Sequence, residues 1–170
     1  MTNNLKNHEI QLYNNILLLT RNKLLYTKFN LSDTFQNRIN LIFIHISFLF
    51  IKLKQTKNQK EYKEFQQRMF DLIFKKIEEN MREIGYGDVT VNKNMKFLVK
   101  TFYNVLLDCE KYNSYNQDSK VLFLNKYFDI KSDKNGTDNA GIIGYFNKYY
   151  SFCLDLSSDS VLQGKLNFNY

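Results

Sequence analysis

Two amphipathic helical patterns, separated by a glycine-rich break, occupy the middle of this sequence between Asn58 and Tyr112. In each pattern the apolar residues recur at steps of three and four, the spacing that places side chains on one face of an α-helix. The first pattern consists of Tyr62, Phe65, Met69, Ile73, Ile77, Met81 and Ile84. The second consists of Met95, Leu98, Phe102, Val105, Cys109 and Tyr112. We therefore expect two helices whose apolar faces share one core.

The break at residues 85–88, Gly-Tyr-Gly-Asp, predicts a corner between these helices. Gly85 is suited to the positive φ angle at which many helices end, because glycine has no Cβ to clash there. Gly87 permits a tight turn, and Asp88 or Thr90 can cap the helix that follows. The sequence thus predicts a helical hairpin or corner.

Asp71, Arg82 and Asp88 are polar residues of this region that need an explanation. Each has an ordinary interpretation as part of a solvated helix face or as a helix cap. Arg82 near the end of the first helix can also form a bidentate pair with Asp88 and lock the corner. We expect this role to be structural, because the sequence has no Ser/His/Asp order, phosphate-binding glycine loop or zinc-ligand spacing. Nothing in the sequence indicates an enzyme.

Two further helices are expected before this hairpin, at about residues 9–26 and 34–54, after a polar tail at residues 1–8. Ser32 or Asp33 is expected to cap the second. Its segment from Leu41 to Ile51 is almost wholly apolar but far shorter than the roughly 20 residues of a membrane span. We therefore expect a helix buried at the centre of the core.

His45 lies within this apolar run and has two interpretations, as a hydrogen-bonded core histidine or as a residue facing a partner. The other histidine, His8, lies in the polar tail, and no cluster of possible ligands accompanies His45. A metal or haem site is therefore not expected, and we predict no cofactor. The two cysteines, Cys109 and Cys153, are compatible with buried thiols or with a disulfide.

Positive charge is concentrated in the first two-thirds of the chain, where residues 1–112 hold 18 Lys and Arg against 11 Asp and Glu. Four lysines at the end of one expected helix and the start of the next form a candidate basic patch: Lys52, Lys54, Lys57 and Lys60. They can simply complement a helix dipole, or they can bind anionic lipid or ribosomal RNA phosphates. No aromatic residues alternate with them, so sequence-specific nucleic-acid binding is not expected.

After Tyr112 the pattern predicts a short helix at 120–128, an exposed loop at 130–139, a helix from Asp138 to about Leu156 and a last short helix at 159–164. Strand-like alternation is weak throughout. The fold class expected is all-α, as a single irregular domain of about six or seven helices over residues 1–170.

A set of defined residue types runs through both hairpin helices: Gln67, Met69, Phe70, Asp71, Phe74, residues 80–85 (Asn-Met-Arg-Glu-Ile-Gly), Gly87, Asp88, Val91, Lys93, Met95, Lys96, Phe102 and Tyr103. Upstream, Ile44-His45 precedes Lys52-Leu53-Lys54, and a fainter similarity lies at residues 162–165. Over about residues 35–112 this pattern resembles the ubiquinol-cytochrome c chaperone family.

That resemblance implies an assembly chaperone for the cytochrome bc complex (respiratory complex III), with newly made cytochrome b as client. It also implies a possible small co-chaperone, and a location in the bacterial cytoplasm peripheral to the inner membrane, or in the mitochondrial matrix of a eukaryote. The residues it suggests for client or partner binding are His45, Asp71, Arg82, Gly85, Gly87, Asp88, Lys93 and Tyr103. The residues by themselves support a simpler alternative, a basic helical module associated with a membrane surface, a ribosome or RNA, without a respiratory role.

Overall fold

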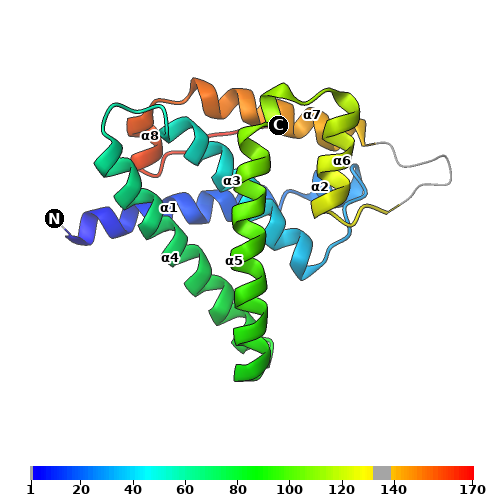
Figure 1. Ribbon diagram of the computed structural model, residues 1–170, viewed down its shortest axis with the longest axis horizontal. Helices are drawn as coiled ribbons and strands as arrows, with labels where there is room; N and C mark the ends of the chain where they lie inside the picture. The colour runs from blue at the N-terminus through cyan, green and yellow to red at the C-terminus, as the bar shows by residue number, and fades with distance from the viewer. Residues whose placement is uncertain (1, 132–138) are drawn as a thin grey trace.

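The computed structural model describes residues 2–131 and 139–170, which form an all-α domain (Figure 1). Its elements are α1 Thr2–Thr20, α2 Lys23–Thr27, α3 Phe35–Leu53, α4 Gln59–Glu83, α5 Asp88–Glu110, the 3-10 turn η1 Tyr112–Ser114, α6 Gln117–Tyr127, α7 Ala140–Asp155 and α8 Ser158–Leu162. The extended pairing within these residues is an isolated bridge between Leu31 and Ile130. The all-α prediction is confirmed.

Helix α3 is the centre of the core, as its apolar run predicts. Every residue of the segment 39–50 is buried, and α3 packs against α1, α4, α5, α7 and α8. Such a helix must be enclosed by others, because burying each large apolar side chain stabilises the fold by about 1.5–3 kcal/mol. Among the described helices, none is both long and apolar enough to cross a membrane.

Helices α4 and α5 meet at one end of the molecule and diverge from it, with α5 across the face shown in Figure 1. Their predicted apolar stripes do face the core, and the two helices join through aromatic contacts around α3. The ring centroid of Phe43 on α3 lies 5.6 Å from that of Phe74 on α4 and 5.2 Å from that of Phe102 on α5. Ile84 is a correction to the predicted stripe, because it follows the last turn of α4 and is 59% exposed.

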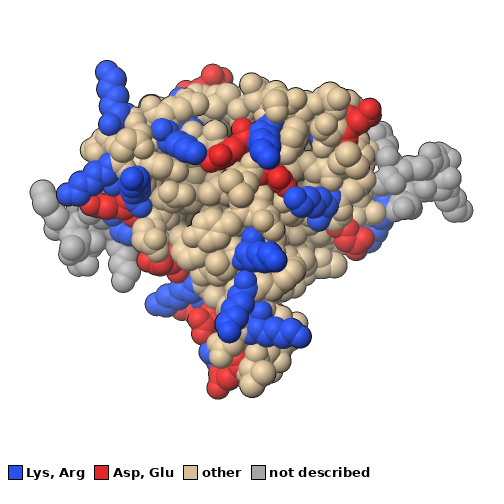
Figure 2. Space-filling model, in the orientation of Figure 1, with Lys and Arg blue, Asp and Glu red and all other residues tan. Residues whose placement is uncertain are grey.

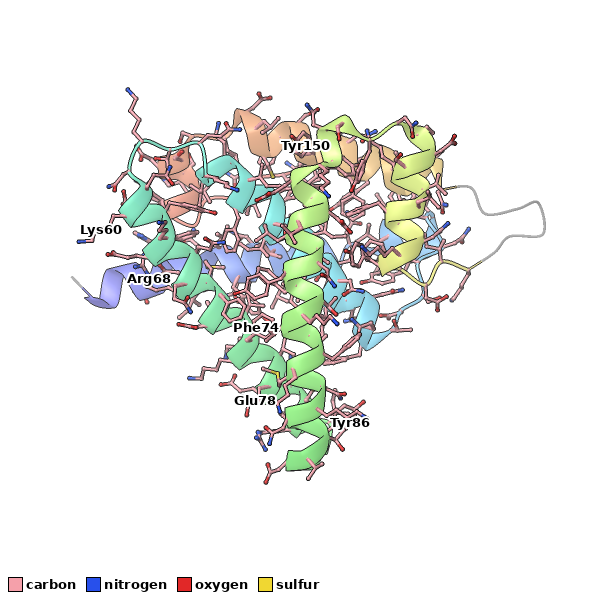
Figure 3. All side chains as sticks on the ribbon, in the orientation of Figure 1. Lys60, Arg68, Phe74, Glu78, Tyr86 and Tyr150 are labelled. Carbon is pink, nitrogen blue, oxygen red and sulfur yellow. The ribbon has the colours of Figure 1, made fainter. Side chains whose placement is uncertain are left out.

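The N-terminal helix differs from its predicted span of 9–26. It starts at Thr2 and ends at Thr20, and α2 begins after Asn22, whose side chain accepts a hydrogen bond from the backbone N–H of Leu24. That local bond caps α2 and interrupts the helical path. Arg68 of α4 holds α1 through an ion pair with the buried Glu9, with 2.7 Å between Nε and Oε1 (Figure 3).

Two helix starts also differ from prediction. Thr34, rather than Ser32 or Asp33, caps α3 by accepting from the N–H of Asn37, and Asn116 caps α6, which begins at residue 117 instead of 120. Helix α7 begins at Ala140, and the predicted start at Asp138 lies outside the described residues. Several side chains near each boundary can cap a helix, so the local sequence does not select among them.

Both cysteines are buried free thiols, which decides between the two possibilities left open by their spacing. Burial raises the pKa of Cys153 to about 12 and also raises the pKa of Cys109. These thiols are therefore inert at neutral pH and contribute as small apolar side chains.

Candidate functional site

The corner between α4 and α5 has the backbone geometry of a helix-terminating glycine motif. Gly85 has a φ angle of 101°, its N–H donates to Arg82 O over 3.0 Å, and the N–H of Tyr86 donates to Met81 O over 3.1 Å. These two bonds satisfy carbonyls at the end of α4 that have no helical partner. Gly87 has a φ of −72°, which any residue can adopt, so the turn depends on Gly85.

Arg82 joins the two sides of the corner. Its Nη1 lies 2.5 Å from Asp88 Oδ1, while Nε and Nη2 both donate to Glu78 Oε1, at 3.1 and 2.9 Å. The predicted Arg82–Asp88 pair is confirmed, although the double contact is made with Glu78. The predicted cap is wrong: Gly87 occupies the N-cap position of α5 and Asp88 is the first helical residue, with its carboxylate directed to Arg82. Figure 3 shows Glu78 and Tyr86 at this far end of the hairpin.

Beside the corner lies a hollow of about 250 Å³ between α1, α3 and the end of α4, which we call the corner hollow. Its lining is Tyr13, Leu17, Thr20, Arg21, Phe35, Arg38, Ile39, Ile42, Ile77, Asn80, Glu83 and Ile84. Most of these residues are apolar, while Arg21, Arg38 and Glu83 bring charge to it. The exposed Ile84 is positioned by the turn at Gly85, so the corner and the hollow are one structural unit.

His45 does not reach this site or any other part of the surface. It is fully buried; Nδ1 lies 2.6 Å from Leu41 O and Nε2 lies 2.7 Å from the hydroxyl of Tyr145. Because the carbonyl can only accept, Nδ1 carries the proton and the Tyr145 hydroxyl donates to Nε2. Burial lowers the pKa of His45 to about 4. The structure therefore corrects the expectation of a partner-facing residue: His45 links α3 to α7.

Two of the four lysines of the candidate basic patch are held by contacts within the fold. Lys52 Nζ donates to the carbonyl oxygen of Leu154 over 2.6 Å, and Lys54 Nζ lies 2.8 Å from Glu110 Oε1. Lys60 lies near Glu64 at 4.0 Å, at the start of α4 in Figure 3. Lys57 is exposed and makes no ion pair with a described residue. This arrangement favours the structural interpretation of these lysines over a concentrated anion-binding site.

The remaining predicted residues lie on the outer side of the hairpin, away from the corner hollow. Tyr103 is 52% exposed and, with Phe70 and Phe102, lines a shallow depression of about 290 Å³ between α4 and α5. Asp71 is exposed on α4 and accepts a hydrogen bond from Gln67 over 2.8 Å. Lys93 is exposed on α5. The predicted set is therefore divided between the corner, the outer face and the core.

No group of three or more His, Cys, Asp or Glu side chains within the described ranges has a geometry that could hold a metal ion. The corner and its hollow present mainly apolar side chains and an exposed turn, with Arg82 tied to Glu78 and Asp88 and with charges from Arg21, Arg38 and Glu83. Such a surface is suited to binding another protein.

Comparison with known proteins gives the same family as the sequence motif. The pattern of the ubiquinol-cytochrome C chaperone family matches residues 27–168, which is most of the chain. This chain belongs to that family. Members are chaperones of complex III assembly. A search of curated protein sequences found no match.

The fold of this family member is similar to that in the crystal structure of the Cbp3 homolog from Brucella abortus. The TM-score is 0.80 at 22% sequence identity, and the match covers 99% of this chain and 92% of the other. At this identity the likeness concerns the fold. It extends over α1, which lies entirely outside the family match at residues 27–168.

Two features of this chaperone-family chain escaped the sequence interpretation. The corner hollow combines residues from three helices, and no local pattern indicates which residues will meet there. The outer face of α5 could have been found, because the sequence has no Asp or Glu between Val89 and Leu107 while it has three lysines there.

Proposed function

We propose that this chain is an assembly chaperone for respiratory complex III that binds newly made cytochrome b through the corner hollow. The observation that carries the proposal is the family match over residues 27–168, which includes α3 and α4, two of the three helices that form the hollow. The client itself is inferred from the resemblance of the motif at residues 80–88, which builds the corner.

The physical argument concerns unassembled apolar surface. A membrane protein without its partners exposes apolar helix faces, which must be covered to prevent aggregation. The corner hollow has a mostly apolar lining, and Ile84 and Tyr86 stand exposed around the turn, at 59% and 41%. An amphipathic or apolar helix can place one or two large side chains into such a hollow, and each contributes about 1.5–3 kcal/mol when fully buried.

A rigid corner makes this surface useful. The turn at Gly85 and the contacts of Arg82 with Glu78 and Asp88 define the direction in which Ile84 projects. A preorganised surface loses less conformational entropy on binding than a mobile one. In this proposal Arg82, Gly85 and Asp88 position the client surface rather than form its contacts.

A peripheral location at the inner membrane, on the cytoplasmic side in a bacterium or the matrix side in a mitochondrion, follows from this function, because the client is inserted there. A small co-chaperone and a ribosome contact are further elements of the proposal that derive from the family resemblance alone. Asp71, which is exposed on α4, is available for such a second contact.

The test is the substitution Ile84→Asp, which puts a carboxylate at the edge of the hollow without disturbing a buried residue. Leu122→Asp on α6 is the matched control, since Leu122 is 70% exposed and lies outside the hollow. We expect Ile84→Asp to reduce spectroscopic cytochrome b severalfold while the chaperone accumulates normally, and Leu122→Asp to have no effect. Site-specific photocrosslinking from position 84 should capture cytochrome b.

Wild-type cytochrome b content in cells with Ile84→Asp, together with crosslinks from position 84 to other proteins only, would refute the client site. If a strain lacking the whole chain keeps normal complex III, the respiratory role itself is wrong. The alternative of a basic module at a membrane surface, a ribosome or RNA would then be the better description.

A further inference from the structure

The outer face of α5 is a continuous surface of one charge sign. Between Val89 and Leu107 the sequence contains three lysines and no acidic residue. Positions at steps of four and three along this helix share its outward side. They are Val89, Lys93, Lys96, Lys100, Tyr103 and Leu107.

The lysines of this face are not neutralised by the fold. Lys93, Lys96 and Lys100 are exposed and form no ion pair within the described part of the chain. The acidic side chains at the two ends of the helix are already engaged, Asp88 by Arg82 and Asp108 by Lys126. Figure 2 shows Lys and Arg side chains following the lower half of α5, with acidic side chains grouped over the end of α4 instead.

Exposed apolar side chains flank the lysines on the same side of the helix. Val89 is 83% exposed, Tyr103 52% and Leu107 57%. With a rise of 1.5 Å per residue, Val89 and Leu107 are separated by about 27 Å along a straight helix. The face is therefore a long, straight strip that is cationic in the middle and apolar toward its ends.

We propose that this outer face of α5 docks on an anionic membrane surface. Lys93, Lys96 and Lys100 bind lipid phosphate groups, and Val89, Tyr103 and Leu107 enter the headgroup boundary between them. This mixture of lysine, aromatic and aliphatic side chains on one helix face is typical of helices that lie in a membrane interface. The inference rests on the proposed function, to whose peripheral location it adds the surface of contact.

A planar lipid surface fits this strip better than an RNA backbone or an acidic protein. A plane touches a straight helix along its whole length. A lipid surface can also bury the exposed valine and leucine side chains, whereas nucleic-acid phosphates cannot. The corner hollow is built by α1, α3 and α4, so α5 can lie on the membrane while the client occupies the hollow.

The test is cosedimentation of the purified full chain with vesicles of phosphatidylcholine alone or of equal parts phosphatidylglycerol and phosphatidylcholine. The test variant is K93E/K96E/K100E, and the matched control is K28E/K57E/K60E, which reverses the same number of exposed lysines after α2, at the α3–α4 connection and at the start of α4. We expect the wild type to bind the anionic vesicles and to be released from them by salt. It should not bind vesicles of phosphatidylcholine alone. The partition coefficient of the α5 variant should fall by at least about a hundredfold, because each lysine near an anionic surface contributes a factor of about five and each introduced glutamate adds repulsion.

A second measurement uses the absence of tryptophan from this chain. Tyr103→Trp introduces a single fluorophore on the proposed face, and Leu18→Trp places one on α1, where the side chain is 67% exposed. Anionic vesicles should shift the emission of the first to shorter wavelength and leave the second unchanged. The inference is overturned if the wild type does not bind, if both charge-reversed proteins lose binding equally, or if both fluorophores shift alike. The purified chain is sufficient for these measurements, so their failure is distinct from a failure of client binding.

Discussion

Tyr145 donates its hydroxyl hydrogen to Nε2 of His45, with 2.7 Å between the two atoms, although the residues are 100 positions apart in sequence. The other ring nitrogen is held by Leu41 O within α3. A fully buried imidazole is thus neutral and completely hydrogen-bonded, which stabilises the packing of α7 on α3.

The first prediction is a loss of stability in mild acid. Burial lowers the pKa of folded His45 to about 4, whereas the unfolded chain protonates near 6.5. Between these values the unfolded state binds more protons, so the free energy of unfolding falls as pH falls through this window. From about pH 7 to about pH 5 the wild type should lose about 2 kcal/mol more than His45→Gln. Urea unfolding of both proteins at each pH measures this, and equal losses would show that another group is responsible.

The second prediction concerns the donor of that bond. Tyr145→Phe leaves Nε2 of His45 buried without a partner, which should lower the free energy of unfolding by about 1–3 kcal/mol. Tyr150→Phe on the same helix is the control, because the Tyr150 ring is half-buried and its hydroxyl makes no hydrogen bond to a buried group among the described residues. We expect the control to unfold like the wild type in denaturant titrations; a similar loss in both variants would argue against a special role for the His45 bond.

The third prediction separates the two glycines of the corner. Gly85 has a positive φ, and a Cβ there meets no neighbouring atom, so Gly85→Ala should cost about 1 kcal/mol through backbone strain alone. Gly87 lies in an ordinary φ region with equally open space. The preference of the N-cap for glycine and the lower entropy of alanine in the unfolded chain oppose each other, so Gly87→Ala should change stability by less than about 0.5 kcal/mol. Thermal unfolding distinguishes the two, and a comparable cost at both positions would contradict this view of the turn.

In cells, Gly85→Val should lower cytochrome b content, because a β-branched residue redirects α5 and displaces Ile84. Asp88→Ala should weaken the tie between α5 and Arg82 without unfolding the domain, since both side chains are exposed and Arg82 keeps Glu78. Normal growth on substrates that require complex III, with both variant proteins at wild-type abundance, would show that the corner has no role in client binding.

The fourth prediction is a severe effect at Gly164. This residue has a φ of 74°, and a Cβ there would lie 2.4 Å from the backbone oxygen of His8 in α1. Gly164→Ala should therefore cost about 2–4 kcal/mol, from strain plus a backbone clash. The matched control is Gly144→Ala in α7, where the nearest atom is 3.6 Å away and alanine should stabilise the helix by about 0.5–1 kcal/mol. Melting temperatures that move in the same direction would refute the close approach of the C-terminal segment to α1.

The segment at residues 162–165, which has a faint similarity to the chaperone family, contacts the first helix in the structure. The carbonyl oxygen of Gly164 accepts a hydrogen bond from Asn15 Nδ2 over 2.9 Å, so the segment after α8 is attached to the first helix. The sequence showed the glycine, but the contact with α1 depends on a fold that returns the C-terminal end of the chain to its beginning.

The local sequence determined the helices, the corner and the burial of α3. Apolar periodicity predicts the inner faces of α4 and α5 because helical geometry repeats every 3.6 residues, and Gly85 predicts the positive φ because other residues are strained there. The sequence did not determine which residue caps α3. The side chains of Ser32, Asp33 and Thr34 can all accept a hydrogen bond from a helix N-terminus, and the backbone path selects Thr34.

The tertiary structure decided what each polar side chain does. His45 is a core residue because it is hydrogen-bonded to Tyr145. Lys52 donates to the Leu154 carbonyl, and Lys54 forms an ion pair with Glu110. These contacts join positions that are 56 to 102 residues apart. The corner hollow likewise requires α1, α3 and α4 to meet. Such meetings depend on the angles at which helices pack, and those angles result from the whole set of apolar contacts rather than from any one segment.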